Sequence, residues 1–487
     1  MINRLIIFRV MGSLILIEAA LLLLSLGIGL IYQEYDIAAF LYTTLIATVL
    51  GGTLWYAGRK AENRMSRRDG YIVVACAWTV FSLIGMLPYI ISGYIPNVAD
   101  AFFETMSGFT ATGATILDNI EEGGHGLLFW RSLTQWLGGL GIVFFTLAVL
   151  PIFGLGEVKL FAAESIGPTH EKLHPRISTT ARRIWIVYLG LTLTCMGCLM
   201  LGGLDWYDAI CHSMTCTATG GFSTYQDSIA HFHSPYVEYV ITFFMFAGSI
   251  NFTLTYHCFF QRHFGRFWKD MELRWFTWII IGATVICTFC LWSRMYHVNL
   301  SLEESFRQAI FQVVSIVSTT GFATADYNMW PHVTWSILAC LMFMGGCAGS
   351  TVGGFKVIRI VMLVKIAYNE FRHILHPNAV IPIRINEKVI DGGMRTTLCA
   401  FLFVYLLTIV VATIIFNFMG LAFSEAIGVS LSSLSNVGPS FGRFGPEFSW
   451  SILPDAGKIL ASFLMLIGRL EIFAVLLLFT PQFWKNR

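Results

Sequence analysis

The chain has 487 residues, of which 56% are hydrophobic and only 12% are charged, and its mean hydropathy is +0.69. Soluble proteins carry about 25% charged residues, so this composition excludes an ordinary soluble protein. It indicates an integral membrane protein whose main partner is the lipid bilayer. The net charge of +2 gives no reason to expect a nucleic-acid partner.

Ten apolar runs are long enough to cross a bilayer, which takes a helix of about 20 residues. In chain order they lie near residues 10–32, 38–58, 72–94, 128–152, 184–203, 236–260, 275–294, 333–361, 397–420 and 457–480. The first run follows Arg4 and Arg9, is too long for the core of a signal peptide and lacks a cleavage pattern. We therefore expect it to be a retained span.

Basic residues are concentrated at both termini and in every second connection between the spans. Those connections lie near residues 59–68, 159–183, 262–274 and 355–396. The positive-inside rule places them on the cytoplasmic side. Ten spans then put both termini in the cytoplasm as well.

Four further stretches, on the outer side, are apolar but too short to cross. They lie at residues 99–113, 207–220, 306–321 and 423–438. Each is about 20 Å long as a helix of roughly 14 residues and lies between two spans, so it must enter the membrane and return. Irregular backbone at that depth is tolerated only where protein buries it or where it lines a water-filled cavity. Four such segments predict a shared lumen.

The four re-entrant stretches are copies of one unit. Each begins with a polar residue before an alanine and reaches a glycine 12 or 13 residues later. The glycines are Gly113, Gly220, Gly321 and Gly438, preceded by Thr110-Ala111-Thr112, Thr217-Ala218-Thr219, Ser318-Thr319-Thr320 and Ser435-Asn436-Val437. A unit of span, short helix, Thr/Gly segment and span therefore recurs four times in one chain.

This repeat predicts an all-α integral membrane fold in which four pseudo-symmetric span–pore helix–span units surround one central pore. An N-terminal transmembrane hairpin, residues 1–65, lies outside the repeat. We expect the pore repeats at residues 66–182, 183–273, 274–394 and 395–487, with a glycine-rich broken helix in the third.

The Thr/Gly segments have the chemistry of a filter for a dehydrated monovalent cation. Backbone carbonyls and Thr hydroxyls can replace the water oxygens of the ion, and glycine permits the positive φ that turns successive carbonyls toward one axis. A single Thr/Gly run is more typical of an external turn, but four copies at matched positions favour the filter. The expected ion ligands are Ala111, Thr112, Gly113, Ala218, Thr219, Gly220, Thr319, Thr320, Gly321, Asn436, Val437 and Gly438.

The eighth apolar run is interrupted by the sequence GGCAGSTVGGFK at residues 345–356. It lacks the Lys-Ser/Thr ending and the preceding strand of a phosphate-binding loop, so we reject nucleotide binding. We interpret the run as a flexible gate below the filter, the alternative being a packing kink that lets helices approach closely. The gate residues are Gly345, Gly346, Gly349, Ser350, Thr351, Gly353 and Gly354.

The tenth apolar run contains an arginine, Arg469, in the sequence IGRLEIF. A charge at that depth is costly and by default functional. We expect Arg469 to face the lumen, where its charge forms a barrier to cations and its side chain holds carbonyls of the glycine-rich loop. The alternatives are pairing with Glu471 or extension of the side chain to the inner membrane surface.

Other candidate motifs carry less weight. The pairs Cys195–Cys198 and Cys287–Cys290 lie inside apolar runs, whereas zinc sites need four converging ligands, so we read these residues as small apolar side chains. Motifs of metalloproteases, serine hydrolases or dinucleotide-binding enzymes do not occur, and we do not expect an enzyme. Glu104 and His212 lie in the re-entrant stretches and receive no role.

From about residue 70 onward, these features resemble the Trk/Ktr/HKT superfamily of potassium transporters. The resemblance rests on the four filter glycines, on SNVGP in the last repeat, on GGCAGSTVGGFK and on GRLEIF. The N-terminal hairpin and the total length are similar to the TrkH branch. The resemblance implies a single-chain pore folded like a tetrameric potassium channel, with K⁺ bound at the filter and no organic cofactor on this chain.

The resemblance also implies partners and a location. TrkH-like proteins are homodimers of the bacterial inner membrane that work with TrkA, a cytosolic ring of RCK domains that binds nucleotides. In HKT relatives a serine at the first filter glycine accompanies sodium transport, so Gly113 favours potassium. The third and fourth filter segments depart from Thr-Ala-Thr, which leaves the number of equivalent ion sites open.

The expected function is therefore potassium uptake through a pore that a cytosolic nucleotide-binding partner controls. A symporter that couples K⁺ to H⁺ or Na⁺ remains the alternative, although no acidic residue clearly faces the inner lumen. A membrane sensor without flux of its own is a further possibility, which ion conduction by the purified protein would exclude.

Overall fold

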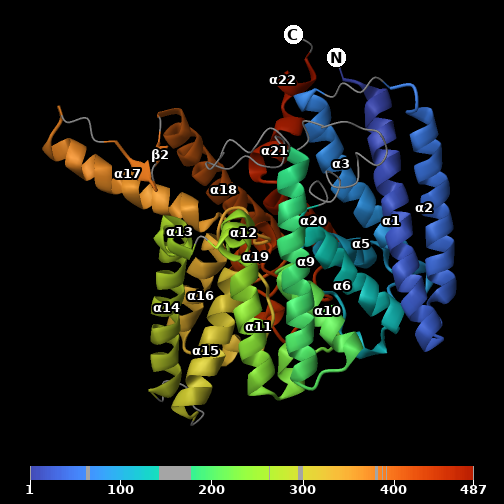
Figure 1. Cartoon of the computed structure of the whole chain (residues 1–487), viewed down its shortest axis with the longest axis horizontal. Coiled ribbons are helices and arrows are strands. Elements are labelled where there is room, and N and C mark those ends of the chain that lie inside the picture. The colour runs from blue at the N-terminus through green and yellow to red at the C-terminus, as the bar shows by residue number, and fades with distance from the viewer. Residues whose placement is uncertain are drawn as a thin grey trace.

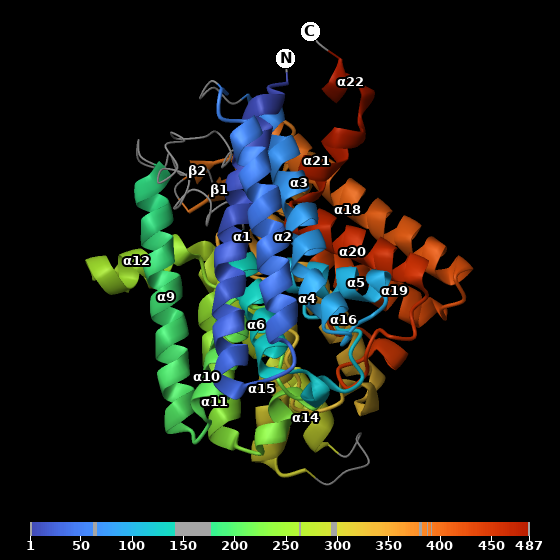
Figure 2. The same cartoon turned by 90° about the vertical axis from the view of Figure 1, so that its right-hand side faces the viewer.

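The computed structural model describes residues 2–61, 66–141, 177–262, 264–293, 300–378, 382–386, 388–390 and 392–485. These residues form a helical bundle with both chain ends at the same end (Figures 1 and 2). Within these described ranges, six helices are long and apolar enough to cross a membrane. Two bent pairs of helices also qualify when each pair is counted as one span.

The N-terminal hairpin consists of α1 (Arg4–Tyr32) and α2 (Ile37–Ala57). The two helices approach closely because small residues lie between them: a Cβ on Gly12 would meet the backbone of Trp55 and Gly51, and one on Gly58 would meet the backbone of Arg9. Close backbone approach at small residues is a common way to join helices in membranes. Leu45 and Val49 of α2 remain exposed, as expected for a face toward lipid.

Each repeat contains one long helix followed by a short helix. The long helices are α3 (Arg67–Gly85), which α4 (Leu87–Ile91) extends, α9 (Ile177–Leu201), α14 (Met271–Trp292) and α18 (Gly392–Phe418). The short helices are α5 (Val98–Phe109), α10 (Trp206–Thr217), α15 (Leu302–Val317) and α19 (Phe423–Ser435). The four short helices overlap the four stretches that were too short to cross, and α15 begins four residues earlier than predicted.

The second span of each repeat begins with α6 (His125–Gly139), α11 (Pro235–Gly248), α16 (His332–Met344) or α20 (Asp455–Arg469). In repeats two to four a further helix follows, namely α12 (Phe252–Gln261), α17 (Val357–Leu375) and α21 (Ile472–Leu476). The structure describes the predicted span 128–152 only through residue 141, so the rest of that prediction lies outside the described residues. The predicted interruption of the third repeat is confirmed, since α16 ends at Met344 and α17 begins at Val357.

The structure corrects two predicted spans, 236–260 and 457–480, which are bent rather than continuous. The chain turns by 103° between α11 and α12, and by 114° between α20 and the helical segment Ile472–Phe479. At the first break the Asn251 side chain accepts hydrogen bonds from the N–H groups of Thr253 and Leu254 and so begins a new helix. At the second break Glu471 has a left-handed backbone, with φ of 58°.

Short elements complete the fold. The helices α13 (Phe264–Lys269) and α22 (Pro481–Trp484) accompany the 3₁₀ turns η1 (Ile120–Glu122), η3 (Ser228–Phe232), η4 (Tyr327–Met329), η5 (Gly442–Phe444) and η6 (Leu477–Phe479). The antiparallel strands β1 (Arg384–Ile385) and β2 (Lys388–Val389) pair Arg384 with Val389 and were not expected from the sequence. Asn386, at their turn, accepts from the Met271 N–H and donates to Asp270, which docks the hairpin on the start of α14.

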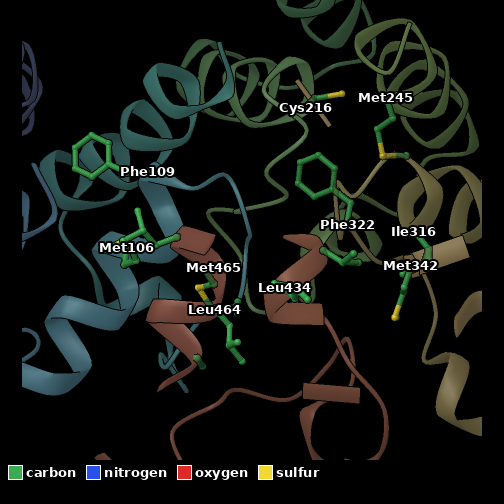
Figure 3. Close-up of a cluster of buried hydrophobic side chains, with 14 of the residues drawn as sticks. Met106, Phe109, Cys216, Met245, Ile316, Phe322, Met342, Leu434, Leu464 and Met465 are labelled. Atoms are coloured by element: carbon green, nitrogen blue, oxygen red, sulfur yellow. The ribbon is translucent and has the colours of Figure 1, made fainter. Parts of the chain in front are cut away.

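The apolar core holds the inner ends of the short helices in place. Figure 3 shows side chains from all four of them, Met106 and Phe109, Cys216, Ile316 and Leu434, beside Met245 of α11, Met342 of α16, and Leu464 and Met465 of α20. All are buried. Because protein interiors are close-packed, this cluster fixes where the four filter segments begin.

Candidate ion filter and the loop beneath it

The four filter segments share one backbone conformation. A residue with φ between 51° and 56° comes first, and a glycine with φ between 77° and 98° follows two residues later. The pairs are Ala111 and Gly113, Thr219 and Gly221, Thr319 and Gly321, and Asn436 and Gly438. The residue between them donates its N–H to the carbonyl five residues earlier, as Thr112 to Ser107, Gly220 to Thr215, Thr320 to Ser315 and Val437 to Ser432.

This pattern corrects the sequence alignment of the second repeat by one residue. Gly220 was expected to match Gly113, but its backbone hydrogen bond matches that of Thr112. Gly221 has the conformation of Gly113. The equivalent set in this repeat is therefore Thr219, Gly220 and Gly221, while Ala218 caps α10. The two glycines are adjacent, so their spacing in the sequence could not distinguish them.

The glycines make contacts that form a closed cycle through the four repeats. A Cβ on each would lie closer than 3.0 Å to the carbonyl oxygen of the residue before the glycine of another repeat. Gly113 faces the oxygen of Gly220, Gly221 that of Thr320, Gly321 that of Val437, and Gly438 that of Thr112. Only glycine fits such a contact, and the four carbonyls thus surround one axis.

An open cavity lies above this ring. Gly113, Gly221, Gly321 and Gly438 all line it, together with Phe222, Tyr225, Pro439 and Trp450. The remaining walls come from the segments that follow the filter glycines and from Arg131 of α6. The ring is therefore accessible from one side through a vestibule.

Acidic residues lie in the loops beyond the vestibule. Desolvation and the neighbouring charges of Asp326 and Asp227 raise the pKa of Glu447, which indicates that the three carboxyl groups lie near one another. Glu121, in the 3₁₀ turn η1, accepts from the N–H of Gln226, which itself lines the cavity. A negative mouth raises the local concentration of cations.

A buried ion pair, Glu104 with Arg131, supports the first two filter segments. Arg131 Nε lies 2.7 Å from Glu104 Oε1, and both side chains are almost completely buried. Glu104 also accepts from the N–H of Ile116, and Arg131 Nη1 donates to the Ser223 carbonyl at 2.7 Å. The pair thus holds the chain just beyond both glycines. Arg131 lies inside a predicted span, and the rule that singled out Arg469 could have found it.

His212 has a structural role in the same place. Its Nδ1 lies 2.8 Å from the Asp208 carbonyl and its Nε2 lies 2.9 Å from the Ser223 hydroxyl. A carbonyl only accepts, so Nδ1 carries the proton and Nε2 of the neutral ring accepts from Ser223. The buried imidazole therefore ties α10 to the loop after its own filter segment.

The glycine-rich loop, residues 345–356, lies directly against the filter segments. The Gly353 N–H donates to Thr319 Oγ1 at 3.0 Å, and Thr219 Oγ1 lies 3.0 Å from Thr351 Oγ1. A Cβ on Gly353 would meet the Ser435 carbonyl. The loop consequently touches the second, third and fourth repeats at the end of the filter opposite the vestibule.

The other side of the loop is anchored at the break between α11 and α12. The Phe252 N–H donates to the Gly349 carbonyl at 3.0 Å, and the Cys347 N–H donates to the Ser249 carbonyl at 3.1 Å. Glu272 of α14 accepts from the Ala348 N–H at 2.7 Å. The remaining expected residues shape the turn itself: Gly345, Gly349 and Gly354 have positive φ, Gly346 packs on Val352, and Ser350 Oγ donates to the Cys347 carbonyl.

Arg469 lies at the end of α20 and joins three repeats. Its Nη1 donates to the Thr351 carbonyl at 2.7 Å, and its Nη2 donates to the carbonyls of Gly138 and Gly139 at 2.6 and 2.5 Å. The expected contact with the glycine-rich loop is therefore present. Glu471, the alternative partner, accepts instead from Arg359 Nη2 at 2.6 Å.

Carbonyls and hydroxyls, rather than a cluster of acidic or sulfur ligands, supply the oxygen atoms of this site. Within the part of the chain that the structure describes, no group of three or more His, Cys, Asp or Glu side chains could hold a metal ion. The four cysteines of the two CxxC pairs are free thiols in α9 and α14. Neutral oxygens suit a weakly held monovalent cation.

Comparison with known proteins gives one consistent result. The family model TrkH, described as "Cation transport protein", matches residues 36–486. The chain is 38% identical over 483 residues to the Trk system potassium uptake protein TrkH of Escherichia coli K12, covering 99% of each chain. It is 34% identical over 478 residues to TrkG of the same strain, covering 98% of this chain and 97% of TrkG.

A solved structure matches at the level of the fold. The crystal structure of the potassium transporter TrkH from Vibrio parahaemolyticus has a TM-score of 0.88 and 33% identity, covering 98% of this chain and 99% of that one. The predicted all-α membrane fold and the predicted resemblance are confirmed, and so is the expectation of a transporter rather than an enzyme. The chain belongs to the TrkH family of cation transport proteins.

Proposed function

We propose that this chain is the pore subunit of a potassium uptake system and selects K⁺ at the carbonyl ring. The observation that carries the proposal is the closed cycle of contacts through Gly113, Gly221, Gly321 and Gly438. Rings of backbone carbonyls replace the hydration shell of K⁺ in selective pores. The relatives named potassium uptake proteins, and the potassium transporter of known structure, support K⁺ as the ion.

The short helices add to the attraction for a cation. α5, α10, α15 and α19 each end where a filter segment begins. Their C-terminal ends carry the negative end of the helix dipole, and the four ends converge on one ring. Together with the acidic mouth, this arrangement draws a cation to the ring without placing a carboxylate in it.

The glycine-rich loop and Arg469 form the gate in this proposal. The loop rests against the filter through the Gly353–Thr319 and Thr351–Thr219 contacts, and Arg469 holds it at the Thr351 carbonyl. Ion flow requires the loop to leave this position. The positive charge of Arg469 opposes the passage of a cation until the loop moves.

A cytosolic partner would control this movement through α17. The helix follows the loop directly and projects away from the bundle near the end that carries both termini (Figure 1). Its last turn is basic, with Arg372 and His373. A TrkA-like ring of RCK domains that binds a nucleotide is the proposed regulator, and movement of α17 would pull on the loop.

The proposed assembly is a homodimer in the bacterial inner membrane with both termini in the cytoplasm. α17 carries a row of exposed apolar side chains, Tyr368, Phe371, Ile374 and Leu375, that the described part of this chain leaves uncovered. A contiguous apolar patch on a projecting element is typical of an interface, and a second copy related by twofold symmetry would cover it.

Reversal potentials of the purified protein in lipid vesicles test the proposed function. Opposed K⁺ and Na⁺ gradients are applied, with the pH varied on one side. A potential that follows the K⁺ gradient and ignores pH is the expected result. A potential that shifts with pH or with Na⁺ at fixed K⁺ would instead indicate coupled transport, and absence of any flux would contradict the proposal.

A further inference from the structure

The second filter segment lacks a pair of hydroxyl side chains that the first and third segments contain. In the first repeat the hydroxyls of Thr110 and Thr112 lie 2.7 Å apart, and in the third those of Ser318 and Thr320 lie 2.7 Å apart. Each pair links the end of the short helix to the residue whose carbonyl belongs to the ring. The equivalent residues of the second repeat are Ala218 and Gly220, which have no hydroxyl.

Gln135 of α6 occupies the vacant space behind this segment. Its Nε2 donates to the Gly220 carbonyl at 2.7 Å, and its Oε1 accepts from the Phe222 N–H at 3.0 Å. A Cβ on Gly220 would lie closer than 3.0 Å to the carboxamide of Gln135. The carboxamide therefore stands where the side chain of residue 220 would begin.

We infer that Gln135 is a positioning residue of the filter, which fixes the Gly220 carbonyl in the ring. This inference rests on the proposed function, in which the ring selects the cation. Two consecutive glycines are the most permissive backbone a filter segment can have, because neither Gly220 nor Gly221 has a Cβ to restrict it. A clamp that bridges the carbonyl of Gly220 and the N–H of Phe222 restricts the rotation that both glycines allow.

The burial of Gln135 supports this role. The residue is fully buried, and a buried amide is costly unless its polar atoms are hydrogen-bonded. Both hydrogen bonds described for its carboxamide go to the second filter segment. Two other polar residues of α6, Ser132 and Thr134, differ from Gln135, since they donate to carbonyls of their own helix, those of Leu128 and Arg131.

The test compares the permeability ratio of K⁺ to Na⁺ in vesicles for wild type, Gln135→Met and Ser132→Ala. Methionine keeps the approximate length of the side chain but makes neither hydrogen bond. Loss of both hydrogen bonds lets alternative carbonyl orientations compete, so we expect the ratio to fall about tenfold. The Ser132→Ala control changes a buried hydroxyl in the same helix and should leave the ratio unchanged.

Two further measurements separate positioning from folding. Thermal unfolding in K⁺ and in Na⁺ reports ion binding without flux, and the extra stability in K⁺ should shrink in Gln135→Met but not in Ser132→Ala. The double variant Gln135→Ala/Gly220→Thr gives the second segment the threonine of the first and third. It should recover part of the ratio lost in Gln135→Ala alone, because the new side chain fills the same space.

The outcomes distinguish this inference from the proposed function. If the wild-type potential does not follow K⁺, the proposed function fails. If wild type selects K⁺ and the folded Gln135→Met variant keeps its ratio within about twofold, the inference about Gln135 is overturned while the proposed function stands. Reduced flux at an unchanged ratio would also overturn it, because a merely structural role predicts that result.

Discussion

Glycines with a left-handed backbone occur both inside and outside the filter. Their surroundings show whether a position requires glycine for its backbone conformation alone or also for lack of space. Gly221, with φ of 77°, has the Thr320 carbonyl where an L side chain would begin. Gly203, with φ of 92°, has no described atom within 4 Å of an added Cβ. The first position needs glycine for conformation and for space, whereas the second needs it for conformation alone.

We therefore expect Gly221→Ala to abolish K⁺-selective flux and Gly203→Ala to preserve it. A left-handed non-glycine residue costs about 1–2 kcal/mol in either place, so the control matches the backbone strain. Only Gly221→Ala also displaces a ring carbonyl. Potassium-dependent uptake by cells and reversal potentials in vesicles provide the measurement. Equal flux through both variants would contradict the corrected alignment of the second repeat.

Arg469 combines a charge with three hydrogen bonds, and two substitutions separate these contributions. Arg469→Gln removes the charge and weakens the hold on the Thr351 carbonyl, so we expect basal flux to rise. Hydrogen bonds to charged groups contribute about 1.5–3 kcal/mol each, which corresponds to a rise of about tenfold or more. Arg469→Lys keeps the charge but cannot reach Thr351 and the end of α6 together.

The lysine variant decides between the two parts of the proposed gate. Flux that stays low in Arg469→Lys assigns the barrier to charge, and flux that rises assigns it to the hold on the loop. Single-channel or vesicle flux measurements report the result. Arg443→Gln is the control, since Arg443 is 63% exposed and pairs with Glu425 at the start of α19, away from the glycine-rich loop. Wild-type flux in both Arg469 variants would remove Arg469 from the gate.

At the scale of the elements, the N-terminal hairpin is connected to the pore through the first turn of α6. Glu34 and Asp36, in the turn between α1 and α2, accept hydrogen bonds from the N–H groups of His125 and Leu127. Glu34 Oε1 also lies 2.6 Å from His125 Nδ1. Acidic groups at a helix N-terminus satisfy free N–H donors and interact favourably with the helix dipole.

Removal of these caps should destabilise the protein without changing its selectivity. We expect Glu34→Ala and Asp36→Ala each to lower the free energy of unfolding by about 1 kcal/mol, as for loss of a helix cap. Thermal unfolding in detergent measures the effect, with Glu370→Ala at an exposed position of α17 as the control. A change in permeability ratio at unchanged stability would show instead that the hairpin acts on the filter.

The elements differ in how well the sequence predicted them, and local causes explain the difference. The short helices and the interruption at 345–356 follow from apolar length and from a run of glycines, which are local signals. The bends at Asn251 and Glu471 depend on one cap and one left-handed residue, and neither is distinctive in an apolar run. A two-residue β-hairpin is likewise too short for strand periodicity to show.

At the candidate site, too, the features with a local sequence signal were predictable and those that depend on packing were not. In the first, third and fourth repeats the positive-φ residues are among those that the repeat singled out, because the conformation is local. The clamp from Gln135 to Gly220 and the pair of Glu104 with Arg131 join residues far apart in the chain. Such partners depend on how the repeats pack, and a single sequence contains no record of that packing.

At the scale of the whole molecule, the fourth repeat must meet the first if one chain is to form a ring. The contact of Gly438 with the Thr112 carbonyl closes the ring at the filter. Nearer the start of the short helices, Lys458 of α20 pairs with Asp100 of α5 at 2.5 Å. Asn436 also donates to Thr112 Oγ1 at 2.9 Å. Contacts within this one chain, at the filter and near the start of α5, therefore close the ring.

An exposed apolar surface on α17 bears on the proposed dimer. Phe371 and Ile374 are each 67% exposed on a helix that projects from the bundle (Figure 1). Burial of such side chains contributes about 1.5–3 kcal/mol each. In a twofold-symmetric interface each contact occurs twice, once from each subunit. We therefore expect Phe371→Ser/Ile374→Ser to convert a dimer into a monomer of 54.6 kDa.

Light scattering of the purified protein, corrected for bound detergent, measures this change in mass. Leu45→Ser/Val49→Ser on α2 is the matched control, because it removes apolar side chains of similar exposure from a face that lipid covers. The control should keep the mass of the wild type. If the wild type itself has the mass of one chain, or if the α17 variant stays dimeric, the interface does not lie on α17. Because α17 follows the glycine-rich loop directly, a monomeric variant with altered flux would also connect assembly to the gate.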